Sequence, residues 1–186
     1  MGKIYFTSDL HFNHNRDFIW KARGFNSVEE MNETIIKNFN KIITDEDTLY
    51  LCGDSMLGMD AQAGLNLLRR LKGQKYLVIG NHDTDNRIAS YKESGIFVEV
   101  QPQYRVKYKG RTYLITHYPT LVSNNGFNDV INIHGHTHSK NHLSENPYCY
   151  NVNVDAWDCV PVDFENIHNE GLKIWNKEKK DGWVNE

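Results

Sequence analysis

The sequence has few cysteines, few prolines and no long apolar run. Its 3 cysteines are an odd number without CxxC spacing, which disfavours both a disulfide framework and a zinc knuckle. No run approaches the roughly 18 apolar residues of a membrane span. Residues 1–3 lead directly into a strand-like run rather than a signal-peptide core. We therefore expect a reduced, cytoplasmic protein with no membrane partner.

The sequence also lacks an excess of basic residues. The chain has 21 basic and 24 acidic residues, a net charge of −3, and no long basic block. Because binding of duplex nucleic acid rests on many lysine and arginine contacts to phosphates, we expect no duplex partner. The lysine-rich stretch 173–180 is expected to be a solvated helix end or tail. No obligate protein partner is indicated.

The length of 186 residues fits one domain. With 4 prolines and 13 glycines, disorder and low complexity are disfavoured. We expect a single domain over residues 1–186, with a flexible tail from about residue 176. The abundant feature is histidine: 9 are present, and His134, His136 and His138 fall within five positions. This cluster is where function is expected.

The first half of the chain alternates strand-like and helix-like segments. Residues 3–7, 48–52 and 76–79 are compact apolar runs, each followed by a polar loop. A helix is expected over 27–43, where Ser27 and Glu30 form a capping-box signature. A second helix is expected after Asp60, with Gly73 at its C′ position. This alternation predicts parallel βαβ units in an α/β fold.

After about residue 95 the pattern becomes rich in strands. Strand candidates are residues 97–100, 104–108, 113–116, 130–133 and 148–154. Lys109-Gly110 separates two of them and is typical of a hairpin turn. We therefore expect one domain with a parallel N-terminal half and a strand-rich C-terminal half.

Five groups of metal-binding side chains follow the predicted strands: Asp9 and His11, Asp54, Asn81 and His82, His117, and His136 and His138. In open α/β sheets, ligands bind at the carboxyl ends of strands, so these groups should converge. Asp54 and Asn81 each follow a glycine and are also compatible with ordinary turn residues. The inference therefore rests on all five groups together.

The donor types restrict the metal. Imidazole, carboxylate and amide oxygen without thiolate suit Mn, Fe, Zn, Co or Ni, whereas Mg and Ca prefer oxygen alone. Seven candidate ligands exceed the four of a tetrahedral zinc site. They fit two metals about 3.5–4 Å apart that share one carboxylate. We expect two divalent ions, manganese in the first place, with Fe, Ni, Zn or Co as alternatives.

In order and spacing, these motifs resemble those of the calcineurin-like metallophosphoesterases. The matching residues are Asp9-x-His11, Gly53-Asp54, Gly80-Asn81-His82-Asp83, His117 and Gly135-His136-Thr137-His138. The segments 8–14 and 153–157 further resemble a small bacterial and phage branch of that family. The resemblance implies a four-layer α-β-β-α sandwich of two mixed sheets, with a dimetal site at the strand ends.

The resemblance also implies roles for individual residues. Asp54 would bridge the two metals, His82 would be a non-ligand histidine facing the leaving group, and Asp83 would orient His82. One metal would be held by Asp9, His11 and His138. The other would be held by Asn81, His117 and His136.

With these roles, the resemblance implies a phosphoric ester hydrolase. A metal-bridging hydroxide would attack phosphorus in line, and His82 would protonate the departing alkoxide. The expected substrate is a small, nucleotide-like phosphodiester or phosphomonoester. His14 and Arg16 are candidate substrate contacts, although both are also compatible with solvated positions. Tyr118 and Trp157 are candidates for base stacking or for packing. A small single-strand nuclease and a non-catalytic scaffold on the same fold are the alternatives.

Overall fold

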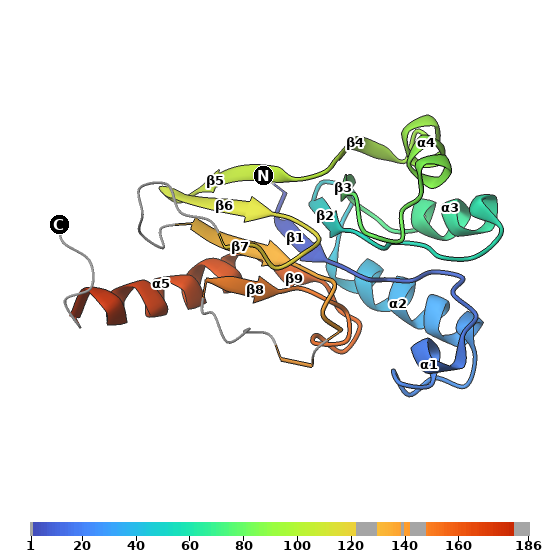
Figure 1. The fold of residues 1–186 in the computed structure, drawn as a ribbon, viewed down its shortest axis with the longest axis horizontal. Coiled ribbons are helices and arrows are strands. Elements are labelled where there is room, and N and C mark those ends of the chain that lie inside the picture. Colours follow the sequence, from blue (N-terminus) through green and yellow to red (C-terminus); the bar gives the residue numbers. More distant parts are fainter. Residues whose placement is uncertain (1, 122–129, 139, 142–147, 181–186) are drawn as a thin grey trace.

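The computed structural model describes residues 2–121, 130–138, 140–141 and 148–180. They form two mixed sheets with helices packed around them (Figure 1). The first sheet has the order β4 (Phe97–Gln101), β3 (Gln74–Val78), β2 (Thr48–Cys52), β1 (Ile4–Thr7) and β9 (Val162–Asp163). The second has the order β5 (Tyr104–Tyr108), β6 (Arg111–Ile115), β7 (Val130–His134) and β8 (Cys149–Asn151). The predicted α/β fold with two mixed sheets is confirmed.

The two predicted helices are present, with differences at their ends. Helix α2 (Val28–Ile42) begins after Ser27, whose side chain accepts a bond from the Glu30 N–H. The Glu30 carboxylate bonds to Asn26 rather than completing a box with Ser27. Helix α3 (Ala61–Arg69) is capped by Asp60 as predicted. Placing Gly73 at its C′ position was wrong, because the helix ends earlier, at the cap residue Arg70.

Three further helices were not predicted. They are α1 (Asp17–Trp20), α4 (Asp85–Glu93) and α5 (Phe164–Lys180). Helix α1 is short, and α4 buries only Tyr91, so neither gives a clear apolar stripe. Helix α5 contains the lysine-rich stretch expected as a helix end or tail. Of the predicted flexible tail, residues 181–186 lie outside the described residues.

The βαβ prediction explains the first sheet. Strands β1, β2, β3 and β4 pair in parallel, while β9 joins β1 in antiparallel orientation. Strand β4 therefore belongs to the first sheet, because α4 connects it to β3 as one more βαβ unit. In the second sheet, β5 and β6 form the predicted hairpin, and β6, β7 and β8 are parallel. Lys109 and Gly110 both adopt positive φ in the hairpin turn.

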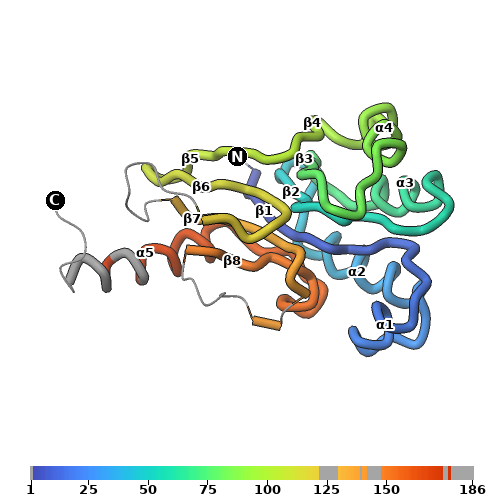
Figure 2. The backbone as a smooth tube through the Cα atoms, viewed as in Figure 1, coloured from blue at the N-terminus to red at the C-terminus, as the bar shows by residue number. Residues whose placement is uncertain are grey.

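Two apolar clusters build the core. One lies between helices α1–α4 and the first sheet, and the other includes residues of both sheets and of α5, such as Phe164. The backbone trace shows the blue-to-green part of the chain on one side of the molecule and the yellow-to-red strands on the other (Figure 2). None of the described helices is both long and apolar enough to cross a membrane. The side chains of Cys52, Cys149 and Cys159 are buried.

The two sheets meet at the carboxyl ends of their strands. Ser8, just after β1, forms a parallel bridge with Asn153, which follows β8. The Val154 N–H donates to the carbonyl of Ser8, and the Gly135 N–H donates to the carbonyl of His117. The loops after β1, β6, β7 and β8 are therefore fixed to one another at this edge.

Candidate metal centre

The structure brings the seven predicted ligands to this shared edge as two adjoining groups. The loop after each contributing strand supplies them: β1 supplies Asp9 and His11, β2 Asp54, β3 Asn81, β6 His117, and β7 His136 and His138. Among the described residues, two sets place potential ligand atoms within 4.8 Å of one another: Asp9, His11 and His138, and Asp9, Asp54 and His117. Asp9 belongs to both sets.

The first group is a triangle of Asp9, His11 and His138. The Nε2 atoms of the two histidines are 3.2 Å apart, and Asp9 Oδ1 lies 3.9 Å from His11 Nε2 and 3.7 Å from His138 Nε2. Burial, reinforced by nearby Arg23, lowers the pKa of His11 to about 2. His11 is therefore neutral at physiological pH, the state in which imidazole binds a metal.

The second group surrounds Asn81 Oδ1. This oxygen lies 2.7 Å from His117 Nε2 and 2.9 Å from His136 Nδ1. Asp54 Oδ2 is 3.5 Å from His117 Nε2 and reaches the group from β2. The other nitrogen of the His117 ring, Nδ1, donates to the Cys52 carbonyl at 2.9 Å, which leaves Nε2 facing the group. Burial lowers the pKa of His136 and favours its neutral form.

The hydrogen bonding of the Asp9 carboxylate shows whether these residues fit a cation. Its Oδ2 accepts bonds from the Ser8 hydroxyl at 2.5 Å and the His136 N–H at 2.9 Å. Its Oδ1 is buried and has no hydrogen-bond partner among the described residues. Burial raises the pKa of Asp9 because the charged form is poorly solvated there. A divalent cation in contact with Oδ1 would supply the missing partner, so the residues fit a metal.

The backbone of the centre is strained. Asp9, His11, Asp54, His136 and His138 all have φ between +46° and +68°, a region that costs non-glycine residues about 1–3 kcal/mol each. Nearby glycines permit close packing. A Cβ on Gly80 would lie 2.2 Å from an Asp54 carboxylate oxygen, and one on Gly135 would lie 1.7 Å from the Ser8 hydroxyl. Five of the seven predicted ligands thus adopt this backbone conformation.

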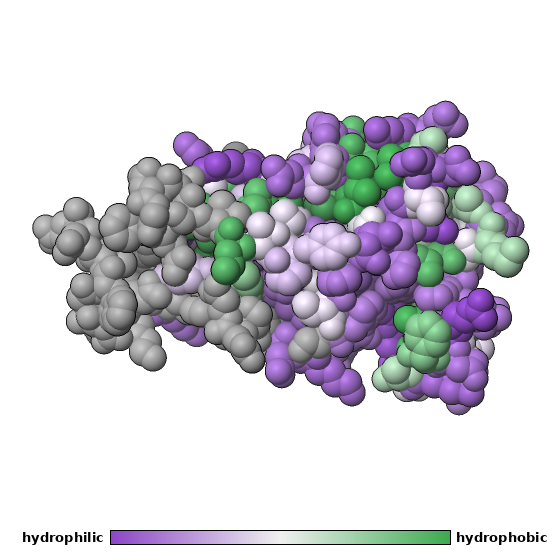
Figure 3. Space-filling view, viewed as in Figure 1, coloured by the Kyte–Doolittle hydropathy of each residue, from purple (hydrophilic) through white to green (hydrophobic). Residues whose placement is uncertain are grey.

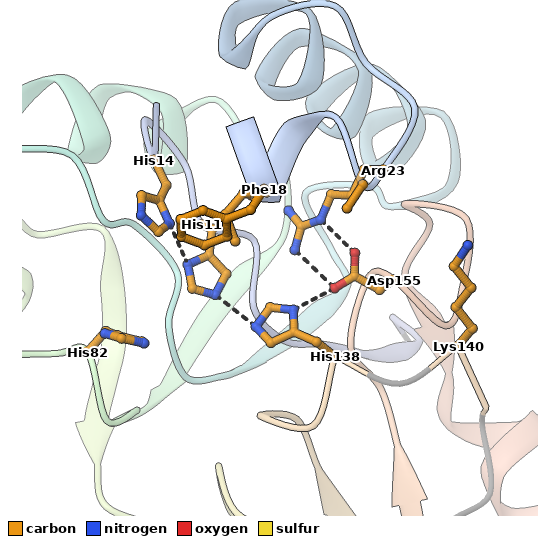
Figure 4. A pocket seen from close by; sticks show the side chains of 10 residues that line it. His11, His14, Phe18, Arg23, His82, His138, Lys140 and Asp155 are labelled. Carbon is orange, nitrogen blue, oxygen red and sulfur yellow. Dashed lines mark hydrogen bonds and ion pairs between the residues drawn. The ribbon is translucent and has the colours of Figure 1, made fainter. Parts of the chain in front are cut away.

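A buried ion pair holds the first group. His138 Nδ1 donates to Asp155 Oδ2 at 2.7 Å, and Arg23 Nε donates to Asp155 Oδ1 at 2.7 Å (Figure 4). The same guanidinium donates to the backbone carbonyls of Asp9 and Leu10. The Asp155 hydrogen bond raises the pKa of His138 and fixes its ring with Nε2 toward His11. Arg23 and Asp155 thus orient the first group.

Sequence reasoning missed these two roles. Asp155 was noted only within the segment 153–157 that resembles a branch of the family, and Arg23 was not singled out. The pairing joins residues 132 positions apart. No local pattern reports such a contact. For Asp155, its position just after a strand-like run was an available signal.

His82 and Asp83 follow β3 beside the centre. His82 lies at its edge with a half-exposed side chain, and its Nε2 is 4.0 Å from Asp54 Oδ2. Asp83 Oδ2 accepts from the N–H groups of Gly80 and Asp54, and its Oδ1 accepts from the Tyr91 hydroxyl. The partners found for Asp83 are these groups rather than His82, so its orienting role toward His82 stays a prediction. Its bonds to the Gly80 and Asp54 N–H groups tie together the loops after β2 and β3.

Other highlighted residues have varied positions. His14 Nδ1 lies 3.3 Å from His11 Nδ1 beside the first group. Arg16 is exposed just before α1 and is not brought to the centre. The half-exposed Tyr118 ring packs against His136, with ring centres 4.5 Å apart. Trp157 stacks on Tyr150 and is held by the Asn151 carbonyl, an arrangement of packing rather than of an open stacking surface.

A cavity opens directly beside the first group. Its volume is about 420 Å³, and its walls include His11, His14, His82 and His138 (Figure 4). Side chains from α1 and the segment after it form the opposite wall. A small molecule in this cavity would contact the predicted metal ligands directly.

The fold and the donor groups at the shared edge agree with the class of protein that sequence comparison gives, the hydrolases of phosphate esters. The chain belongs to the calcineurin-like phosphoesterase family, whose model matches residues 2–185. An uncharacterized protein of Methanocaldococcus jannaschii is 35% identical over 90% of each chain. The Gene 66 protein of Mycobacterium phage L5 is 30% identical, covering 84% of this chain and 88% of its own. A solved structure of a protein of unknown function from Aquifex aeolicus has a TM-score of 0.69 at 27% identity, covering 91% of this chain and 99% of that chain.

Proposed function

We propose that this protein hydrolyses phosphodiesters or phosphomonoesters of small, nucleotide-like molecules with two divalent metal ions. The supporting observation is the convergence of two donor groups on Asp9, whose buried Oδ1 has no hydrogen-bond partner among the described residues. Such a carboxylate oxygen at the meeting point of two imidazole clusters is unfavourable unless a cation binds there. Family membership supplies the reaction class.

The two groups of side chains correspond to the two proposed metal positions. Asp9, His11 and His138 would hold one ion, and Asn81, His117 and His136 the other, with Asp54 between them. Manganese is our first expectation, with Fe, Ni, Zn or Co as alternatives, because the donors are imidazole, carboxylate and amide oxygen. When bound, the ions would offset the charge of the phosphoryl group and lower the pKa of a coordinated water to around 7.

The chain's own residues then supply orientation and a proton. Main-chain and side-chain bonds fix the rings of His117 and His138 before substrate arrives. His82 stands at the open edge of the centre, 4.0 Å from Asp54 and on the wall of the cavity. It would donate a proton from its ring to the departing ester oxygen.

Replacing His82 tests this proposal. Because general acid catalysis contributes typically 10²–10⁴-fold, His82→Ala should lose about that factor in kcat on an alkyl ester. The loss should be smaller on a p-nitrophenyl ester, whose leaving group needs little protonation. The number of bound Mn²⁺ ions, counted by elemental analysis, should stay the same. Equal turnover of the alkyl ester by wild type and variant would remove His82 from the reaction.

Two reporter esters test the reaction class. We expect Mn²⁺-dependent hydrolysis of bis(p-nitrophenyl) phosphate or p-nitrophenyl phosphate, and the ratio of the two rates gives the preference for diesters or monoesters. A lack of activity on both, with Mn²⁺ and with Ni²⁺, would favour a non-catalytic scaffold on this fold.

A further inference from the structure

The cavity beside the metal centre is larger than a phosphoryl group requires. Its volume of about 420 Å³ falls within the range of roughly 300–1,000 Å³ found for small-molecule sites. His11 and His138 form part of its wall, so it continues directly from the first group of predicted ligands. His82 also lines it. The organic part of a substrate bound at the centre would therefore enter this cavity.

One wall of the cavity is apolar and comes from α1 and the residues after it. Phe18, Ile19 and Ala22 form this wall. Ile19 is buried in the core and anchors α1, whereas Phe18 is 68% exposed. The Phe18 ring makes an edge-on contact with His14, at 5.7 Å between ring centres. Packing in the core therefore accounts for the apolar side chain at Ile19. It does not cover the Phe18 ring, most of which stays available to a ligand.

The surroundings of Phe18 indicate what kind of ligand its exposed ring could contact. The face of the molecule in Figure 3 is largely hydrophilic, and one of its hydrophobic spots lies over α1. Across the cavity, His82 and Lys140 lie on opposite sides, with Phe18 between them in the view of Figure 4. An exposed aromatic ring on the wall of a cavity that Lys140 also lines suits an anion that carries a flat apolar group.

We propose that this cavity binds the leaving group of the phosphate ester and selects an aromatic ring, which packs against Phe18. The inference rests on the proposed function and extends it to the substrate class. The ring belongs to the leaving group because His82, the proposed proton donor to the leaving oxygen, lines the same cavity. His14, which contacts both His11 and Phe18, joins the ring site to the metal centre.

Non-hydrolysable phosphonates test this proposal without turnover. Binding of benzylphosphonate and ethylphosphonate to the Mn²⁺-loaded protein can be measured by calorimetric titration. Wild type should prefer the benzyl compound, and Phe18→Ala should reduce that preference about threefold to tenfold, the size of one aromatic contact. Phe18→Tyr should keep it. Val98→Ala removes another exposed apolar side chain on β4, outside the cavity lining, and should also keep it.

The matching activity measurement separates this inference from the proposed function. Benzyl phosphate and ethyl phosphate both release poor alkoxide leaving groups, so the ratio of their kcat/KM values reports ring binding. Phe18→Ala should lower that ratio by the same factor without changing the thermal unfolding curve. An equal affinity for both phosphonates in wild type, or an unchanged preference in Phe18→Ala, overturns the ring site. Ring-selective binding without hydrolysis of any ester would instead overturn the proposed function alone.

Discussion

The two halves of the metal centre are held in place by different means. In the first half, His138 is oriented by Asp155, which is paired with Arg23 in a largely buried ion pair. In the second half, His117 is oriented by the main-chain carbonyl of Cys52, at the end of β2. The second half therefore depends mainly on the sheet itself. The first depends on two side chains brought together from distant parts of the chain.

This difference predicts how the halves respond to mutation. Main-chain support persists as long as the sheet is intact. Side-chain support can be removed by one substitution, and it also depends on the ionisation of Asp155. Substitutions can therefore weaken one half selectively, which is how the following predictions distinguish them.

The largest effect is expected at Asp54, which we propose lies between the two metal ions. Asp54→Asn should reduce hydrolysis by more than the 10–100-fold typical of residues outside the ligand shell. The metal-free variant should be at least as stable as wild type, because the donor set of Asp9, Asp54 and His117 would carry one buried carboxylate instead of two. Urea unfolding in chelator and Mn²⁺ titration measure the two effects. Retained activity with normal metal content would show that Asp54 does not connect the halves.

The next effect is expected at Asp155. The Arg23 side chain is only 3% exposed and that of Asp155 14%, so Asp155→Asn leaves a buried charge unpaired. We expect a loss of about 3 kcal/mol in unfolding free energy and about 10–100-fold weaker binding of one of the two metals. The control Glu33→Gln breaks the exposed pair with Arg70 and should cost less than about 1 kcal/mol. Equal weakening of both metal sites would contradict independent support of the halves.

Acid should weaken the first half selectively. Burial alone would raise the pKa of Asp155, but hydrogen bonds from His138 and Arg23 outweigh it and hold the pKa at about 2, below the ordinary 3.8. A carboxyl with a depressed pKa stabilises the fold above its unfolded pKa and loses that contribution as pH falls through the folded one. The stability difference between metal-free wild type and Asp155→Asn should thus shrink between pH 4 and pH 2. Denaturant titrations across this range measure the difference. A difference that stays constant would contradict the prediction.

The smallest effect is expected at Tyr91, which supports the second half indirectly. Its hydroxyl donates to Asp83 Oδ1 in a buried bond, while Asp83 Oδ2 keeps its bonds to the Gly80 and Asp54 N–H groups. Tyr91→Phe leaves one buried oxygen unpaired and should cost about 1–3 kcal/mol of stability. Because the main-chain bonds remain, the affinity for both metals should change little in Mn²⁺ titrations. A large loss of affinity would mean that the second half also relies on side chains.

The sequence predicted the parts of the fold that depend on local signals. Ser27 and Asp60 cap the two helices expected from them, and Lys109-Gly110 makes the expected hairpin. Helix α4 was missed because it buries only Tyr91, and the two-residue strand β9 is too short to show a period. The end of α3 was misplaced because Gly73 serves the approach to β3 rather than the helix cap.

In the candidate site, too, the features with local sequence signals were predicted and those that depend on tertiary packing were not. The seven expected ligands converge because each follows a strand, and strand ends can be located from apolar runs. The contact of Arg23 with Asp155 depends on tertiary packing and leaves no spacing to detect. The observed partners of Asp83 were not predicted, for a related reason. Neighbouring N–H groups and Tyr91 satisfy its carboxylate, and a sequence does not show which donors will surround a buried acid.

The central claim, that two metal ions at this shared edge hydrolyse a phosphate ester, is tested most directly by titrating chelator-treated protein with Mn²⁺. Bound metal and hydrolysis of bis(p-nitrophenyl) phosphate would be followed in the same samples. We predict two ions per chain at saturation, with activity appearing as the second ion binds. Full activity in the presence of chelator, or saturation at a single ion, would contradict the account.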